Sequence, residues 1–477
     1  MSELRAGMTG FDITPRFHPT CGAWGTTPEM TEVDMPLLGR CLVLEQNQQR
    51  LIWFSADLVG DSPRCTDRLR DEVAEALGMS RDQILWGTTQ NHSSGAPPWS
   101  QFTGAVIADL SNRDEAFAQR EHQRVVSIYV EAAREAIERL QPASVWAGRG
   151  YCDSVSFNTR FPLPTGQLKY CRHHDEAALG GRPIDPTIGL VRFDDAEGKP
   201  IGALFNFNMH PATMINQKMI SPDWVGTARQ CLEDALDGAP VLYCQGFCSD
   251  INCYHMFGTP EQARQTGARL GEAAVAALPT LVPVRSQPLA FLHKTIHLRC
   301  HAMPTREQLE AELAELEKFI EDVKDDPKLI WCLGANLPQQ FSVEEKIRFA
   351  EYRMEYRRAG LRLLAESNLP NPTLPITLGA VRIGDVAAVL SPGENFAETG
   401  IAIRRRSPFV HTLICGDVNG LFGNIFTDED IRRGGYAIDS YFEILSFDGF
   451  RLPPGPGSAQ QVIETCVELL WQLHRQK

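Results

Sequence analysis

The sequence lacks the features that mark a membrane-spanning, secreted or nucleic-acid-binding protein. No window approaches the roughly 18 uninterrupted apolar residues that a membrane-spanning helix needs. The opening residues, MSELRAGMTGFDITP, lack the basic and apolar regions of a signal peptide. The net charge of −14 argues against nucleic acid or an anionic membrane surface as the main partner. We therefore expect a cytoplasmic protein that acts on a small-molecule substrate and that can form a homo-oligomer.

Several common cysteine and glycine motifs are also missing. The 13 cysteines are odd in number and include no CxxC pair, so free, buried thiols in a reducing compartment are expected rather than a disulfide framework. The sequence contains no GxSxG, no Walker loop and no GxGxxG followed by a helix. These absences disfavour a serine hydrolase, an NTPase and a Rossmann enzyme.

What the chain does contain is a repeated alternation of buried strands and amphipathic helices. Apolar runs bounded by turn signals alternate with helical patterns at about 38–92, 204–255 and 385–424, which predicts strand–helix–strand units. The expected fold is α/β, with layered mixed sheets flanked by helices in one domain over 1–477. Charge-rich helices at 304–368 predict an inserted helical hairpin, either a lid or an oligomer contact. The Pro- and Gly-rich stretch 157–186 is expected to be ordered without regular structure.

Each predicted unit carries ionisable side chains at its strand ends. These are Asp57 with His92, His210 with Asp250, and Glu394 with Asp417. Ligands in open α/β sheets bind beyond the carboxyl ends of the strands, so the three groups should face one cleft. Imidazoles and carboxylates are the ligands that zinc and similar divalent metals take in proteins. We therefore predict a divalent metal site, most simply Zn²⁺, held by His92, His210 and Glu394.

An ordered set of short motifs adds a family resemblance. The set is GFDITP, TTQNHSSG, FNTR, NMHPATM with ISPDWVG, QGFCSDIN, SPGENF and NIFTDEDIRRGGY. Together they make the chain resemble the N-terminal catalytic domain of the neutral (non-lysosomal) ceramidase family, whose members are zinc amidases that cleave the N-acyl bond of ceramide. The resemblance implies His210 and Glu394 as metal ligands, and Arg160 and Tyr436 as groups near the scissile carbonyl.

The chain departs from the family pattern at three positions. Gln90 stands where the family has a histidine ligand, Asn424 where it has a tyrosine ligand, and Asn252 where it has a serine. Carboxamides are not typical zinc ligands. Three outcomes stay open: His92 substitutes in a rearranged site, another metal is held, or the metal is absent.

The resulting hypothesis is a ceramidase-like, metal-dependent hydrolase that cleaves an amide-like bond of a small polar molecule other than ceramide. Asp250 or Glu394 would take a proton from water, and Arg160 and Tyr436 would stabilise the oxyanion. The predicted substrate contacts are Gln90, Asn91, Asp223, Asn252 and Asn424. Two alternatives remain: a lyase or isomerase acting on a carbohydrate or polyol with an altered or absent metal site, and a non-catalytic binding protein.

Overall fold

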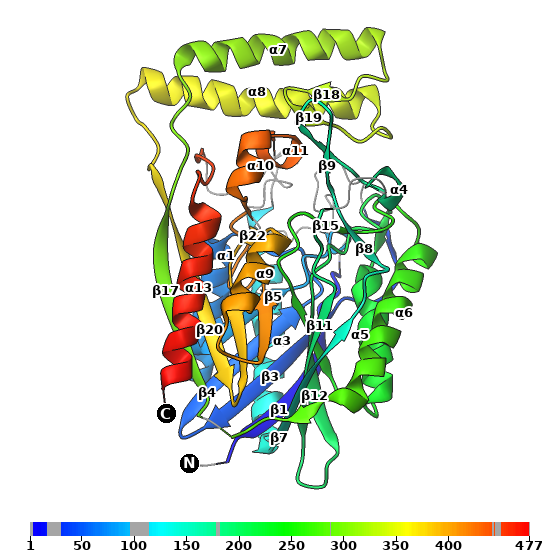
Figure 1. The fold of residues 1–477 in the computed structure, drawn as a ribbon, viewed down its shortest axis with the longest axis vertical. Coiled ribbons are helices and arrows are strands. Elements are labelled where there is room, and N and C mark those ends of the chain that lie inside the picture. The colour runs from blue at the N-terminus through cyan, green and yellow to red at the C-terminus, as the bar shows by residue number, and fades with distance from the viewer. Residues whose placement is uncertain are drawn as a thin grey trace.

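The computed structural model describes residues 3–16, 30–95, 114–177, 182–286, 288–440, 443 and 450–476. Three mixed β-sheets lie at its centre, and helices cover them (Figure 1). This confirms the α/β fold with layered mixed sheets. None of the helices within these residues combines the length and the apolar character that crossing a membrane requires.

The first sheet contains the first predicted strand–helix–strand unit. Its strand order is β5-β4-β3-β1-β6. The strands are β1 (Arg5–Asp12), β3 (Leu38–Gln46), β4 (Gln49–Ala56), β5 (Ile84–Thr88) and β6 (Gln141–Pro142). β4 and β5 are parallel, and α1 (Pro63–Leu77) connects them. The helix begins after Ser62, whose hydroxyl caps it, and ends at Gly78, which has a left-handed φ of 64°. α3 (Glu115–Glu138) covers β1 and β3.

The second sheet holds the central unit. Its order is β14-β12-β11-β7-β16. The strands are β7 (Ser144–Tyr151), β11 (Thr187–Asp194), β12 (Pro200–Phe207), β14 (Val241–Gln245) and β16 (Val282–Pro283). β12 and β14 are parallel and lie on either side of α5 (Asp223–Ala235) in the sequence. α5 packs against α6 (Pro260–Ala277). The apolar run in β12 is buried, as expected for a strand covered on both faces.

The third sheet has the order β17-β20-β21-β23. Its strands are β17 (Ala290–Arg299), β20 (Thr373–Ile383), β21 (Val386–Leu390) and β23 (His411–Cys415). β21 and β23 are parallel, with α9 (Ala397–Arg406) between them in the sequence. The C-terminal helix α13 (Ser458–Arg475) covers this sheet through its contacts with β17 and β20. All three predicted strand–helix–strand units are therefore present.

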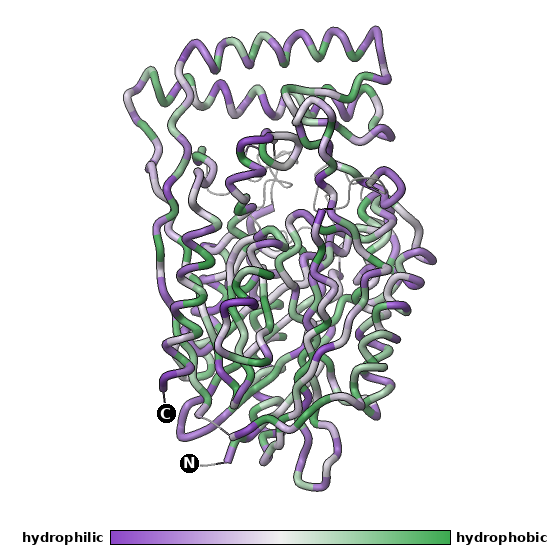
Figure 2. The backbone as a smooth tube through the Cα atoms, viewed as in Figure 1, coloured by the Kyte–Doolittle hydropathy of each residue, from purple (hydrophilic) through white to green (hydrophobic). Residues whose placement is uncertain are grey.

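The main core lies where the three sheets face one another. One buried cluster joins Trp53 of the first sheet, Phe193 of the second and Val381 of the third, each at most 1% exposed. Burying such a side chain contributes about 1.5–3 kcal/mol relative to leaving it exposed. The sheet strands carry long hydrophobic stretches, whereas the hairpin helices alternate between hydrophilic and hydrophobic positions (Figure 2).

The predicted helical insertion consists of α7 (Arg306–Asp325) and α8 (Val343–Ala365), which lie across one end of the molecule (Figure 1). Their apolar faces belong to one buried cluster with Phe396 and Tyr436. The buried Arg353 of α8 donates to the carbonyl oxygens of Cys332 and Leu333, at 2.6 and 3.0 Å. The hairpin is thus packed onto the layer that follows the strand ends and is not an isolated arm.

The expectation that 157–186 lacks regular structure is wrong. The stretch contains β9 (Arg160–Pro162) and β10 (Leu168–Tyr170), which form a hairpin, and the short helix α4 (His174–Ala177). It begins with β8 (Ser156–Asn158), which pairs with β15 (Ile251–Cys253). A strand of three residues is set by a distant partner rather than by local periodicity. The other short elements are β2 (Glu32–Val33), η1 (Arg81–Gln83), β13 (Met219–Ile220), η3 (Leu278–Thr280), β18 (Trp331–Cys332), β19 (Ala335–Asn336), β22 (Glu394–Asn395), β24 (Asn424–Ile425), α10 (Asp428–Arg433) and α11 (Tyr436–Asp439).

Candidate functional site

Segments that follow the sheet strands converge on the side chain of Glu394. Glu394 lies on β22, which pairs in parallel with β24, so that Glu394 stands opposite Asn424. Gln90 follows β5, and His210 follows β12 and bridges to Asn252. Glu394, Gln90, His210 and Asn424 are each at most 5% exposed. The structure thus brings residues from all three strand–helix–strand units to one buried place.

Three nitrogen atoms surround the Glu394 carboxylate. Gln90 Nε2 donates to Oε1 at 2.9 Å, and Asn424 Nδ2 donates to Oε2 at 3.2 Å. His210 Nε2 lies 3.3 Å from the same Oε2. This last contact is an ion pair rather than a well-aligned hydrogen bond, because Nε2 has no hydrogen-bond partner of good geometry among the described residues. We call Glu394 and these three side chains the Glu394 centre.

The pKa values of the two histidines at the site are shifted in opposite directions. Burial disfavours a charged imidazole at His210, but the contact with Glu394 outweighs burial, so the pKa of His210 lies above its ordinary value. Its Nδ1 lies 3.0 Å from the carbonyl oxygen of Ile251 and donates to it. Burial, and to a smaller extent His210, lowers the pKa of His92 well below its ordinary value. His92 is therefore neutral at pH 7.

His92 reaches Glu394 only through Gln90. The His92 Nε2 atom lies 3.1 Å from Gln90 Oε1 and donates to it, while the imidazole rings of His92 and His210 are 5.4 Å apart between centroids. Of the three predicted metal ligands, His210 and Glu394 are in contact and His92 is one side chain removed. In the part of the chain that the structure describes, no three His, Cys, Asp or Glu side chains are arranged to hold a metal ion.

A second carboxyl group, Asp417, lies buried close to the Glu394 centre. Both of its carboxyl oxygens are without a hydrogen-bond partner among the described residues. Burial and, to a smaller extent, the charge of Glu394 raise the pKa of Asp417 well above its ordinary value. A buried carboxyl group with a raised pKa beside a second carboxyl group is typical of an acid–base pair. The sequence predicts Asp417 at a strand end but does not mark it as a site residue.

Tyr170 is a site residue that sequence reasoning missed. Asn252 Nδ2 donates to the Tyr170 hydroxyl at 3.0 Å, and both side chains are buried. Burial raises the pKa of Tyr170, and the charge of Glu394 contributes in the same direction, so the phenol is neutral. Its ring lies 5.0 Å from the ring of Tyr436, between centroids, and the Arg172 guanidinium lies 5.0 Å from each. Tyr170 lies in the stretch that was expected to be irregular, so no periodic signal marked it.

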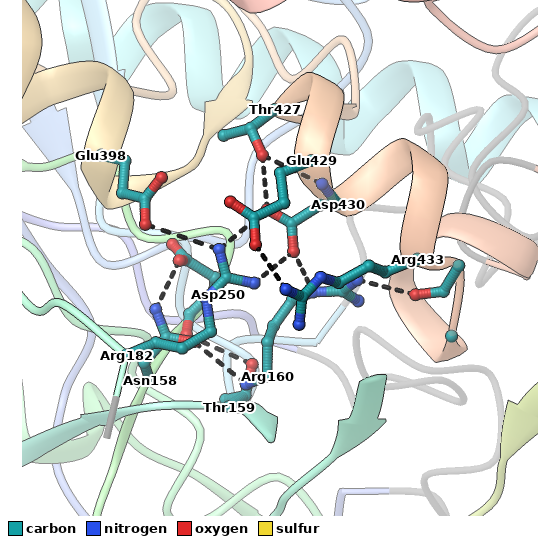
Figure 3. Close-up of polar contacts among 12 residues, drawn as sticks. Asn158, Thr159, Arg160, Arg182, Asp250, Glu398, Thr427, Glu429, Asp430 and Arg433 are labelled. Carbon is teal, nitrogen blue, oxygen red and sulfur yellow. Dashed lines mark hydrogen bonds and ion pairs between the residues drawn. The ribbon is translucent and has the colours of Figure 1, made fainter. Parts of the chain in front are cut away.

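Arg160 is engaged in an ion cluster with the carboxylate of Asp430 (Figure 3). Its Nε donates to Asp430 at 2.7 Å, and its Nη2 donates to the carbonyl oxygen of Gly434 at 2.7 Å. Arg182 also donates to Asp430, at 2.6 Å. Since Gly434 comes two residues before Tyr436, the two residues assigned to the scissile carbonyl are linked through the backbone. Nη1 of Arg160 is buried and has no hydrogen-bond partner within the described residues.

Asp250 holds neighbouring loops together (Figure 3). One carboxylate oxygen accepts from the backbone N–H of Ala397 at 2.9 Å, and the other accepts from Asn158 Nδ2 at 2.7 Å. Burial raises the pKa of Asp250 to about 6. Both oxygens are occupied, so these contacts support a loop-anchoring role better than the predicted role of general base.

Two predicted substrate contacts are occupied by the backbone. Asn91 Nδ2 donates to the carbonyl oxygens of Asp57 and Ser221, at 3.2 and 2.7 Å. Asp223 accepts from the N–H groups of Met214 and Trp224, at 2.9 and 2.7 Å. Gln90, Asn252 and Asn424, in contrast, lie at or beside the Glu394 centre.

The prediction that Asp57 faces the same cleft as His92 is wrong. Asp57 is fully buried and forms a two-point ion pair with Arg229, at 2.9 and 2.7 Å. It also accepts from the backbone N–H of Leu38 at 2.9 Å. A buried carboxylate needs such partners, and α5 supplies the guanidinium. Asp57 therefore links the end of β4 to α5 and does not belong to the site.

The donor set at Glu394 does not fit the zinc that the family resemblance implies. A catalytic zinc takes about three protein ligands, drawn from histidine, cysteine and carboxylate side chains. Here one imidazole and one carboxylate are in direct contact, and the other two members of the centre are carboxamides whose nitrogen atoms face the carboxylate.

The fold and the site define an α/β protein with a buried imidazole–carboxylate centre at its strand ends. Residues 27–251 match the family model described as neutral/alkaline non-lysosomal ceramidase, N-terminal. This match confirms the resemblance predicted from the motifs, and it supports a ceramidase-like hydrolase at the family level.

Two solved structures share the fold. One is a ceramidase complexed with C2, which has 17% sequence identity to this chain. Its TM-score is 0.68 over 99% of this chain and 75% of that chain. The other, a neutral ceramidase from Pseudomonas aeruginosa, is 18% identical, with a TM-score of 0.65 over 98% of this chain and 75% of that chain. At these identities the likeness shows the fold alone.

Proposed function

We propose that the chain is a hydrolase that cleaves an amide-like C–N bond of a small polar substrate. The observation that supports it best is the contact of His210 with Glu394, next to the buried carboxyl group of Asp417. Burial raises the pKa of Asp417, which suits this carboxyl group to the role of acid while Glu394 acts as the base. The family match and the shared fold support a hydrolase.

In the proposed reaction, Glu394 takes a proton from the attacking water, and His210 holds the Glu394 carboxylate in place through their 3.3 Å contact. The water oxygen bonds to the carbonyl carbon, and the C–N bond breaks. Asp417 donates a proton to the leaving nitrogen, so that an amine and a carboxylic acid result. Transfer of the proton from Glu394 to Asp417 then restores the starting state.

The developing oxyanion needs a donor that is not already committed. The Tyr170 hydroxyl accepts from Asn252 and keeps its own hydrogen for donation, so we assign the oxyanion to Tyr170. Arg160 has its Nε and Nη2 atoms bound to Asp430 and Gly434, which supports an anchoring role for its head group, and its Nη1 is a second candidate donor to the oxyanion. Removing one such oxyanion donor costs about 10²–10³ in kcat in other hydrolases.

A small polar substrate is supported by the groups around Glu394. The amides of Gln90, Asn252 and Asn424 and the phenol of Tyr170 offer hydrogen-bonding partners rather than an apolar groove. The helical hairpin packs on Phe396 and Tyr436 close to this region. These features match recognition of a polar molecule better than recognition of a long acyl chain.

The test is hydrolysis of N-acetylated amino acids and N-acetylated amino sugars by the purified chain, followed by amine release and by product mass. We expect a product pair that has gained one water. Glu394→Gln and His210→Ala should each lower the rate by about 10²–10⁴, the usual contribution of general acid–base catalysis. Glu398→Gln is the matched control, because Glu398 makes only a 3.4 Å contact with Arg182 on the same stretch of chain.

Other products would replace the proposal with one of the alternatives. A product of unchanged mass indicates an isomerase, and a bond split without added water indicates a lyase. Binding of a substrate that survives both substitutions, with no turnover, indicates a binding protein. Each of these results would overturn the hydrolase assignment.

A further inference from the structure

We infer that the Glu394 centre works without zinc, because nitrogen donors occupy the side of the carboxylate that a metal would need. The inference deepens the proposed function and rests on it for the assignment of Glu394 as the base. It concerns the chain's own residues and is independent of which substrate is cleaved.

The Glu394 carboxylate has partners on both of its oxygen atoms. Oε1 accepts from Gln90 at 2.9 Å, and Oε2 accepts from Asn424 at 3.2 Å with His210 Nε2 at 3.3 Å. Hydrogen bonds to the charged form stabilise a buried carboxylate as a cation would. Both oxygens of Glu394 are therefore satisfied by groups of the protein itself.

The Gln90 amide is held in one orientation. Its oxygen accepts from His92 Nε2 at 3.1 Å, so its nitrogen faces Glu394. An amide nitrogen has no lone pair for a metal. Turning the amide around would place its oxygen against the Glu394 carboxylate, which loses the 2.9 Å hydrogen bond, and would require His92 to move its proton from Nε2 to Nδ1.

Both hydrogens of the Asn424 side-chain nitrogen are engaged in hydrogen bonds. It donates to Ser249 Oγ at 2.6 Å and to Glu394 Oε2 at 3.2 Å. The two positions where the family resemblance implies metal ligands thus both present N–H groups to the carboxylate. This leaves His210 and Glu394 as the only zinc-type ligands in contact at the centre, within the described residues.

The experiment is a gain of zinc binding. Gln90→His adds a second imidazole beside His210 and Glu394 and so completes a three-ligand set. Residue 90 has a left-handed φ of 61°, which histidine tolerates better than most residues. The exposed Gln339→His is the matched control. Each protein is purified without added metal, incubated with zinc chloride, dialysed and assayed for zinc content and thermal midpoint.

We expect less than about 0.1 zinc per chain in the natural protein and in Gln339→His, and about one zinc per chain in Gln90→His. Zinc should raise the thermal midpoint of Gln90→His alone. About one retained zinc in the natural protein would overturn the inference, and so would a folded Gln90→His variant without zinc.

Asn424→Asp keeps the test decisive if Gln90→His does not fold. This isosteric change places a second carboxylate against Glu394, so the variant should be less stable than the natural protein and regain stability with zinc. Failure of zinc to restore its midpoint would count against the inference. Zinc content is measured without substrate: a zinc-free chain that hydrolyses no amide refutes only the proposed function, and a zinc-loaded chain that does hydrolyse refutes only this inference.

Discussion

Asp430→Asn tests whether the ion cluster of Figure 3 stabilises the fold. The Asp430 side chain is fully buried and contacts Arg160 at 2.7 Å and Arg182 at 2.6 Å. Removing one partner of a buried ion pair costs about 3–5 kcal/mol, because the remaining charge is left without compensation. Arg182 keeps only a 3.4 Å contact with Glu398, and Arg160 keeps the carbonyl oxygen of Gly434. We therefore expect a loss within this range.

The expected change in thermal midpoint follows from the length of the chain. At about 2.1 cal/mol/K per residue, the unfolding entropy of 477 residues is about 1 kcal/mol/K. A loss of about 3–5 kcal/mol then lowers the midpoint by about 3–5 °C in scanning calorimetry. Glu429→Gln on the same helix is the matched control, since its pair with Arg433 is exposed and should contribute less than about 1 kcal/mol.

The effect should depend on pH in one direction. Burial acts to raise the pKa of Asp430, but Arg160 and Arg182 outweigh it, so the pKa lies below its ordinary value. The stabilisation is therefore present above the unfolded pKa of about 4 and is lost as pH falls through the folded pKa. The difference between Asp430→Asn and the natural protein should shrink below about pH 4. A midpoint that matches the Glu429→Gln control at pH 7 would refute the reasoning.

Three further predictions concern other buried groups. Arg229→Met leaves Asp57 buried without its two-point partner and should lower the thermal midpoint by about 3–5 °C in calorimetry. Burial raises the pKa of Asp250 to about 6. Its contribution to stability is therefore present below about pH 4 and declines as pH rises through 6. In Asp250→Asn this part of the pH dependence of the free energy of unfolding should disappear. Arg353→Met removes donors to two loop carbonyl oxygens and should speed hydrogen exchange in 331–365.

Each of these predictions has its own control or contrary result. Arg68→Met breaks an exposed ion pair with Glu72 and should change the thermal midpoint by no more than about 1 °C. If Arg229→Met lowers the midpoint by no more than Arg68→Met does, the argument from the buried ion pair is wrong. An unchanged pH profile in Asp250→Asn would assign that dependence to another group. If hydrogen exchange in the hairpin is equally fast in Arg353→Met and in the natural protein, packing alone holds α8.

Local periodicity was enough to predict the long elements of the fold. The apolar run of β12, the amphipathic pattern of α1 and the charged stripes of α7 and α8 appear where the residues predicted them. The hairpin of β9 and β10 was missed, because a strand of three residues is too short to show an alternating hydrophobic pattern. Their positions depend on pairing with one another and, for the adjoining β8, on β15.

The site was predictable only in part, for a related reason. Strand ends pointed to His210 and Glu394, and the motif comparison pointed to Gln90 and Asn424, all of which meet at the Glu394 centre. Asp57 satisfied the same rule and lies elsewhere, since its partner Arg229 comes from a helix far along the chain. Tyr170 satisfied no rule and lies at the site.

The amino-acid sequence by itself determined the strand–helix–strand repeats, the helical hairpin and the identity of the polar side chains at each strand end. Hydrophobic periodicity and capping residues act over a few positions, so they can be read along one segment of the chain. Only the tertiary structure decided which of those side chains face one another, which amide nitrogens point at Glu394 and which carboxylates are taken by guanidinium groups. Hydrogen bonds and desolvation depend on atoms that come from distant segments, and these atoms come within hydrogen-bonding distance only when the sheets pack.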